Sequence, residues 1–174
     1  MSSSEQHILS AFDRDLESLQ AHLMRLCGLA ETALVDAAKA LEKHDLPTAD
    51  RIIAGDRAID ALEDFIQTEA ASLIARRAPT ARDLRLVLAV MRAAHSLERV
   101  GDYAKNVAKR TRLIPQSAPV DGHSGTIRRM TLLVSRMLDD ATRALATRDA
   151  TLAEAVRARD LDIGRTLVFS VLDL

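Results

Sequence analysis

Residues 9–40 read LSAFDRDLESLQAHLMRLCGLAETALVDAAKA, and this stretch decides the fold. Its apolar residues recur at alternating spacings of three and four, from Leu9 through Leu23 to Ala40. That period places one side of an α-helix against neighbouring helices. We therefore predict a single helix of about 40 residues, or about 60 Å at 1.5 Å per residue, ending near His44.

Two further helices follow with the same period. The first is expected over residues 48–77, because Asp45 can cap its start and Pro47 suits a first turn. Pro79 interrupts the pattern, and Thr80 with Asp83 forms a capping pair for a third helix that reaches about residue 113. Three long helices with short connections predict an up-down-up antiparallel bundle.

The pattern beyond this bundle indicates part of a second one. Residues 115–125 gather turn-forming residues and lose all periodicity, which is typical of a linker. A fourth helix is expected from about residue 127 and a fifth from about Thr151 to the last residue. Shifting the chain by 104 residues aligns 33–70 with 137–174 at eleven identities, among them Asp45 with Asp149.

We therefore predict an all-α protein whose first three-helix repeat spans residues 5–114. A linker over 115–125 leads to a partial second repeat over 126–174, which has two helices and lacks its last one. A two-helix unit leaves an apolar stripe, so we expect it to pair with the first bundle or with another chain.

Composition narrows the classes of partner. The 24 Lys and Arg nearly balance the 25 Asp and Glu, so no broad field favours nucleic acid or an acidic membrane. No uncharged apolar run approaches the roughly 20 residues of a spanning helix, and the N-terminus does not resemble a signal peptide. We expect a cytoplasmic protein without membrane insertion. The single cysteine, Cys27, has apolar neighbours, which predicts a buried, inert thiol.

Two acidic ridges are the candidate functional feature. Oxygen-bearing side chains recur every four residues on the third helix, and the second helix carries a comparable ridge. The helical period places both ridges beside the apolar faces, where we expect them to face outward. Pairing the two helices about the turn at residues 78–79 brings the ridges to the same height, with Gly101 permitting close approach. The candidate metal ligands are Asp56, Asp60, Glu98, Asp102 and Asn106.

Two interpretations of these ridges remain open. Gathered carboxylates repel one another unless a cation lies between them, and oxygen ligands suit hard or borderline metals. Exposed helices also carry acidic residues at this spacing simply as solvated surface, balanced here by basic residues such as Arg99 and Lys105. No Glu-x-x-His pair, phosphate-binding glycine loop or Gly-x-Ser-x-Gly motif occurs, so nothing indicates an enzyme.

Two stretches resemble a known family. Residues 74–87, IARRAPTARDLRLV, followed by residues 97–106, LERVGDYAKN, are similar to PhoU proteins. His7 and residues 12–16, FDRDL, also resemble the N-terminus of that family. The resemblance covers nearly all of residues 7–114.

The resemblance implies a function for the chain. PhoU proteins are tandem three-helix bundles, each with a Glu/Asp-x-x-x-Asp motif that in some members binds iron, zinc or another divalent metal. Here that motif falls on Glu98 and Asp102, with Asp56 and Asp60 facing it. The implied role is negative regulation of the phosphate-starvation response, not catalysis. The implied partners are the ATP-binding subunit of the phosphate ABC transporter and the phosphate sensor histidine kinase, with a homodimer expected. The alternative is a structural helical oligomerisation module without a metal site.

Overall fold

The computed structural model describes residues 3–114 and 124–160, and its regular structure is entirely helical within those ranges. The helices are α1 (Ser3–Lys43), α2 (Leu46–Arg77), α3 (Ala81–Thr111) and α4 (Ser124–Thr147), and residues 150–160 are also helical. Residues 115–123 of the predicted linker and residues 161–174 of the fifth helix lie outside the described residues. The predicted linker was too long at its end, because α4 already begins at Ser124. None of the described helices is both long and apolar enough to span a bilayer.

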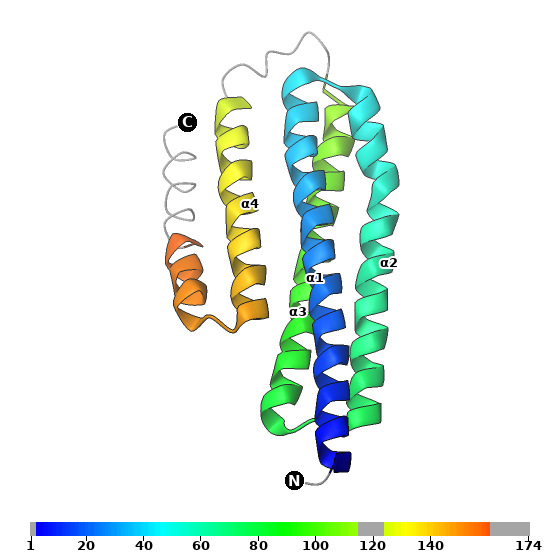
Figure 1. Cartoon of the computed structure of the whole chain (residues 1–174). Helices are drawn as coiled ribbons and strands as arrows, with labels where there is room; N and C mark the ends of the chain where they lie inside the picture. Colours follow the sequence, from blue (N-terminus) through cyan, green and yellow to red (C-terminus); the bar gives the residue numbers. More distant parts are fainter. Residues whose placement is uncertain (1–2, 115–123, 161–174) are drawn as a thin grey trace.

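Helices α1, α2 and α3 form the predicted antiparallel bundle (Figure 1). Its core contains leucines from α1, isoleucines from α2 and valines from α3; Leu26, Ile66 and Val90 are all fully buried. Burying a side chain of this kind stabilises the fold by about 1.5–3 kcal/mol. At the end of the bundle nearest the first turn the core changes to alanines, including Ala40 and Ala104, so the sequence pattern of α1 is confirmed in the packing.

The start of α2 follows the expected capping chemistry, whereas the capping pair predicted at the start of α3 does not cap the backbone. The Asp45 side chain accepts hydrogen bonds from the Thr48 backbone N–H at 3.1 Å and the Thr48 hydroxyl at 2.7 Å, and these lower the pKa of Asp45. Ala78 ends α2 with φ 41°, and its N–H donates to the Ile74 carbonyl. Thr80 is the N-cap of α3, but its hydroxyl donates to Asp83 at 2.8 Å instead of accepting from the backbone.

Helix α4 packs against α1, on the outside of the bundle (Figure 1). Its buried side chains include Thr131, Ser135, Thr142 and Ala144. The turn that follows it repeats the turn after α1. The Asp45 N–H donates to the Ala40 carbonyl and the Asp149 N–H to the Ala144 carbonyl, each at 2.9 Å. The 104-residue repeat therefore extends to the backbone geometry of the two turns.

Candidate functional site: an acidic cluster between two helices

Close contact between α2 and α3 sets the height of the acidic ridges. A Cβ atom on Gly101 would lie 2.9 Å from Ile59 Cδ1, so only glycine fits at this level without a shift. More than two turns further along the bundle, Gln67 Nε2 donates to the Met91 carbonyl at 3.1 Å. These contacts give the register that the antiparallel hairpin predicted, because they bring residues near 60 opposite residues near 100.

Four of the five predicted ligands come together in this register. We call Asp56, Asp60, Glu98 and Asp102 the acidic cluster. Burial raises the pKa of Asp60, and the charges of Asp56 and Asp102 raise it further. Burial likewise raises the pKa of Glu98, as do Asp102 and Asp60. Carboxylates on α2 and α3 are therefore close enough to raise the pKa values of groups on the opposite helix.

Asp56 departs from the sequence prediction. We expected it beside the apolar face of α2 and facing outward, but its exposed fraction is only 4%. The reason is its place in the heptad pattern of α2, because it lies between Ile52 and Ile59 on the buried stripe of that helix. The prediction that both ridges face outward was therefore wrong for Asp56. Asp60 and Glu98 are half-buried, as residues beside the apolar faces should be.

Lys105 completes the site, and sequence reasoning treated it only as a surface charge. Its Nζ donates to Asp56 Oδ2 and, at 3.2 Å, to Asp102 Oδ1. These hydrogen bonds raise the pKa of Lys105, with the one to Asp56 contributing most. The sequence signal that could have placed Lys105 near Asp102 is its spacing, since a residue three positions after Asp102 lies on the same side of the helix. The ammonium thus neutralises part of the charge that the cluster gathers.

One oxygen of Asp56 has no such partner. Asp56 Oδ1 is buried and has no hydrogen bond among the described residues. A buried acceptor left unpaired costs about 1–3 kcal/mol. Asp56 Oδ1 is therefore an oxygen atom that is free to act as a ligand to a bound cation.

His95 and the fifth predicted ligand, Asn106, lie at the margin of the cluster. His95 Nδ1 is 4.0 Å from Glu98 Oε2, and its side chain is largely exposed. Asn106 is exposed on α3, and no hydrogen bond joins it to the cluster in the part of the chain described. In the same residues, no three His, Cys, Asp or Glu side chains form an arrangement ready to hold a metal ion. The donor set fits a hard cation, but Lys105 must move and the carboxylates must turn to bind one.

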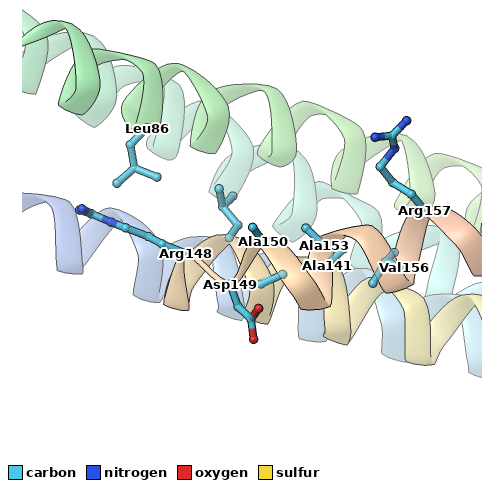
Figure 2. Close-up of a pocket in the computed structure, with 10 residues that line it drawn as sticks. Leu86, Ala141, Arg148, Asp149, Ala150, Ala153, Val156 and Arg157 are labelled. Carbon is cyan, nitrogen blue, oxygen red and sulfur yellow. The ribbon is translucent and has the colours of Figure 1, made fainter.

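Away from the acidic cluster, a crevice lies between the start of α3 and the hairpin of α4 with residues 150–160. Figure 2 shows this crevice, whose volume is about 500 Å³. Leu86, Ala141 and Val156 contribute to a mainly apolar lining, and the Asp149 carboxylate points away from Leu86. Since its lining brings no carboxylates together, it does not compete with the acidic cluster as a metal site.

Comparison with known proteins identifies the family. The family model for the PhoU domain matches residues 23–111 and 127–166, which together make up most of the chain. The chain belongs to the PhoU family. The family resemblance and the helical-bundle fold predicted from the sequence are therefore confirmed.

Individual PhoU proteins match over most of this chain. The phosphate-specific transport system accessory protein PhoU homolog of Caulobacter vibrioides is 35% identical over 158 residues, covering 91% of this chain and 69% of that protein. The homolog of the same name in Xylella fastidiosa is 36% identical over 170 residues, covering 97% and 70%. Both names describe accessory proteins of a transport system.

Solved PhoU structures share the fold. The crystal structure of PhoU from Pseudomonas aeruginosa matches with a TM-score of 0.86 and 31% identity, over 93% of this chain and 78% of that one. The PhoU structure from Streptococcus pneumoniae, described as a phosphate transport system regulatory protein, matches with a TM-score of 0.80 and 28% identity. It covers 88% of this chain and 72% of that one.

Proposed function

We propose that this chain is a cytoplasmic, non-catalytic regulator of phosphate uptake and a negative regulator of the phosphate-starvation response. Its membership of the PhoU family, with relatives named as phosphate transport accessory proteins, carries this proposal. Its direct partners would be the ATP-binding subunit of the phosphate ABC transporter and the sensor histidine kinase. The chain would act as a homodimer.

A genetic experiment tests the regulatory role. Deleting the gene should raise expression from a phosphate-starvation promoter in phosphate-rich medium, and expressing this chain should restore repression. Pulldown of the transporter ATPase and of the sensor kinase with purified protein tests direct contact. A deletion strain with unchanged promoter activity would contradict the regulatory role.

The second part of the proposal is that the acidic cluster binds a divalent cation such as iron or zinc. Four carboxylates, the half-burial of Asp60 and Glu98, and the unpaired Asp56 Oδ1 support it. When bound, the cation would supply charge neutralisation between α2 and α3. The Lys105 ammonium competes for the same oxygens, so a cation can bind only if it stabilises the cluster more than the Lys105 contacts do.

Metal analysis of the purified protein tests this part. Wild type should carry stoichiometric metal, and Asp102→Ala should lose it, whereas Glu17→Ala, an exposed position on α1, should not. Lys105→Met should bind the metal more tightly, because no ammonium then competes for Asp56 and Asp102. Equal, sub-stoichiometric metal in wild type and Asp102→Ala would remove the metal from the proposal.

The alternative function is a structural oligomerisation module in which Lys105 already supplies the cation. The Lys105 contacts with Asp56 and Asp102 favour this alternative, because they neutralise the cluster without metal. It predicts that Glu98→Gln combined with Asp102→Asn leaves partner binding and the phosphate response unchanged. Loss of repression in that double variant, with the fold intact by circular dichroism, would exclude it.

A further inference from the structure

The face of α3 that points away from α1 and α2 carries an unbalanced positive charge. The acidic residues of α3 are Asp83, Glu98 and Asp102. Asp83 and Glu98 are partly buried, and the Asp102 side chain, which is 46% exposed, pairs with Lys105. The exposed faces of α1 and α2 differ, since acidic residues such as Glu17 and Asp64 lie among their basic ones. A net charge of −1 for the whole chain therefore conceals a strongly basic strip.

This strip has a regular composition. We call it the α3 outer stripe; it consists of Arg85, Leu88, Arg92, Arg99, Tyr103 and Arg110. Arg85, Arg92 and Arg99 follow one another at seven-residue intervals, so their Cα atoms lie about 10.5 Å apart along one line of the helix. Leu88 and Tyr103 are 39% and 54% exposed, which is high for large side chains with apolar surface.

The arginines of the stripe are available to a partner. Arg85, Arg92 and Arg110 form no ion pair with any residue in the described parts of the chain. Arg99 Nη2 donates to Tyr103 Oη at 2.9 Å, and its guanidinium carbon lies 5.9 Å from the centre of the tyrosine ring. This contact holds two side chains of the kinds that most often dominate protein interfaces in an exposed, ordered position.

We propose that the α3 outer stripe is a docking surface for an acidic helix of a protein partner. Guanidinium groups bind carboxylates in a planar, bidentate way, and three of them at seven-residue spacing match Asp or Glu at the same spacing on a second helix. Leu88 and Tyr103 would supply the apolar contacts between the charges. The inference rests on the proposed function, since it adds the surface through which such a regulator meets a partner.

Other polyanions fit this surface less well. The acidic cluster borders the stripe on the same helix, so Glu98 and Asp102 would repel the continuous phosphates of a nucleic acid. A membrane would need a broader apolar face than Leu88 and Tyr103 provide. A short acidic helix can bind the stripe and leave the cluster uncovered.

Charge reversal tests the proposal. The double variant Arg92→Glu/Arg99→Glu is compared with Arg25→Glu/Arg57→Glu, which reverses two exposed arginines on α1 and α2. Binding is measured to the transporter ATPase, to the cytoplasmic part of the sensor kinase, and to a synthetic helical peptide with glutamate at every seventh residue. We expect the stripe variant to lose at least about tenfold in affinity for the peptide and for one protein, with the control unchanged.

The outcomes separate this inference from the proposed function. If wild type binds the peptide through the stripe but neither protein, the stripe stands and the proposed partners fall. If wild type binds a protein and the stripe variant binds it within twofold of wild type, the stripe is overturned and the proposed function stands. Failure of wild type to bind the peptide and both proteins overturns both. Equal binding of duplex DNA or of phosphatidylglycerol vesicles, lost in the same variant, would overturn the assignment to an acidic protein.

Discussion

The α1–α2–α3 bundle and the contact between α1 and α4 use the same heptad pattern but are held together differently. The bundle buries leucine, isoleucine and valine, including Leu23, Leu73 and Val87. The residues that α4 buries are instead Thr131, Ser135, Thr142 and Ala144, while its Leu138 and Leu145 are only partly buried. Periodicity therefore predicted that a face of α4 is buried, but not that α1 covers it. The identity of the buried side chains decides the strength of each contact.

The contact between α1 and α4 depends on polar groups. Ser135 Oγ donates to Glu31, and Thr142 Oγ1 lies 3.6 Å from Cys27 Sγ, while the same hydroxyl donates to the Leu138 carbonyl within α4 at 2.8 Å. Hydroxyl groups contribute little transfer free energy, so such a contact opens more readily than an apolar core. We therefore expect α4 to separate from α1 at a lower free energy than that of unfolding the bundle.

The largest expected effect is in the bundle core. Leu26→Ala should lower the free energy of unfolding by about 2–5 kcal/mol, because Leu26 is fully buried and the substitution leaves a cavity. Urea denaturation measures the loss. Met24→Ala, at a position that is 36% exposed, should change stability by less than about 0.5 kcal/mol. The loss of stability in Leu138→Ala should lie between those of these two variants. A loss equal to that of Leu26→Ala would mean that the contact of α4 is as strong as the bundle core.

The next effect concerns the opening of α4. Ser135→Ala removes a hydrogen bond to the Glu31 carboxylate, which is worth about 1.5–3 kcal/mol, so α4 should open at least about tenfold more often. Hydrogen exchange should accelerate in α4 but not in α2 or α3. Burial raises the pKa of Cys27, so this thiol should react slowly with iodoacetamide until α4 opens, and faster in Ser135→Ala.

Ser18→Ala, at an exposed position on α1, is the matched control for this experiment. It should leave both the exchange of α4 and the Cys27 reaction unchanged. Equal acceleration of exchange in all four helices by Ser135→Ala would mean that α4 unfolds only with the bundle.

A smaller effect concerns pH. Burial, together with Asp102 and Asp60, raises the pKa of Glu98 above its ordinary value of 4.5. The folded state therefore binds this proton more tightly than the unfolded state, so stability increases as pH falls from the folded pKa toward 4.5. In metal-free protein, Glu98→Gln removes the ionised form and should be more stable than wild type at pH 7. Thermal melts from pH 7 to pH 4 should show this advantage shrinking, whereas a constant advantage would contradict the shift.

The smallest effect compares the two equivalent turns. Asp45 caps α2 within the bundle, and Asp149 accepts from the Leu152 N–H at 3.0 Å at the start of the helix over residues 150–160. Asp45→Ala should lower the melting temperature, because α2 belongs to the cooperative core. Asp149→Ala should accelerate exchange only in residues 150–160. A larger drop in melting temperature for Asp149→Ala than for Asp45→Ala would contradict the prediction that the bundle is the more stable of the two regions.

The acidic cluster shows what spacing could predict and what it missed. The four-residue intervals placed Glu98 and Asp102 on one side of α3, and the hairpin about Ala78 brought Asp56 and Asp60 to their level. Spacing alone did not predict the salt bridge from Lys105 to Asp56, because a long flexible side chain can reach several partners. Which carboxylate Lys105 contacts depends on the distance between α2 and α3, and the contact between Gly101 and Ile59 sets that distance.

The sequence by itself determined the described helices, their order and the family, because these depend on local periodicity and on short motifs. Only the tertiary structure decided the burial of Asp56, the position of Lys105 and the placement of α4 on α1. The physical reason is that each of these depends on how closely two helices approach and which faces they share. A heptad pattern specifies that a face is buried, but not which helix covers it or which charges that helix brings.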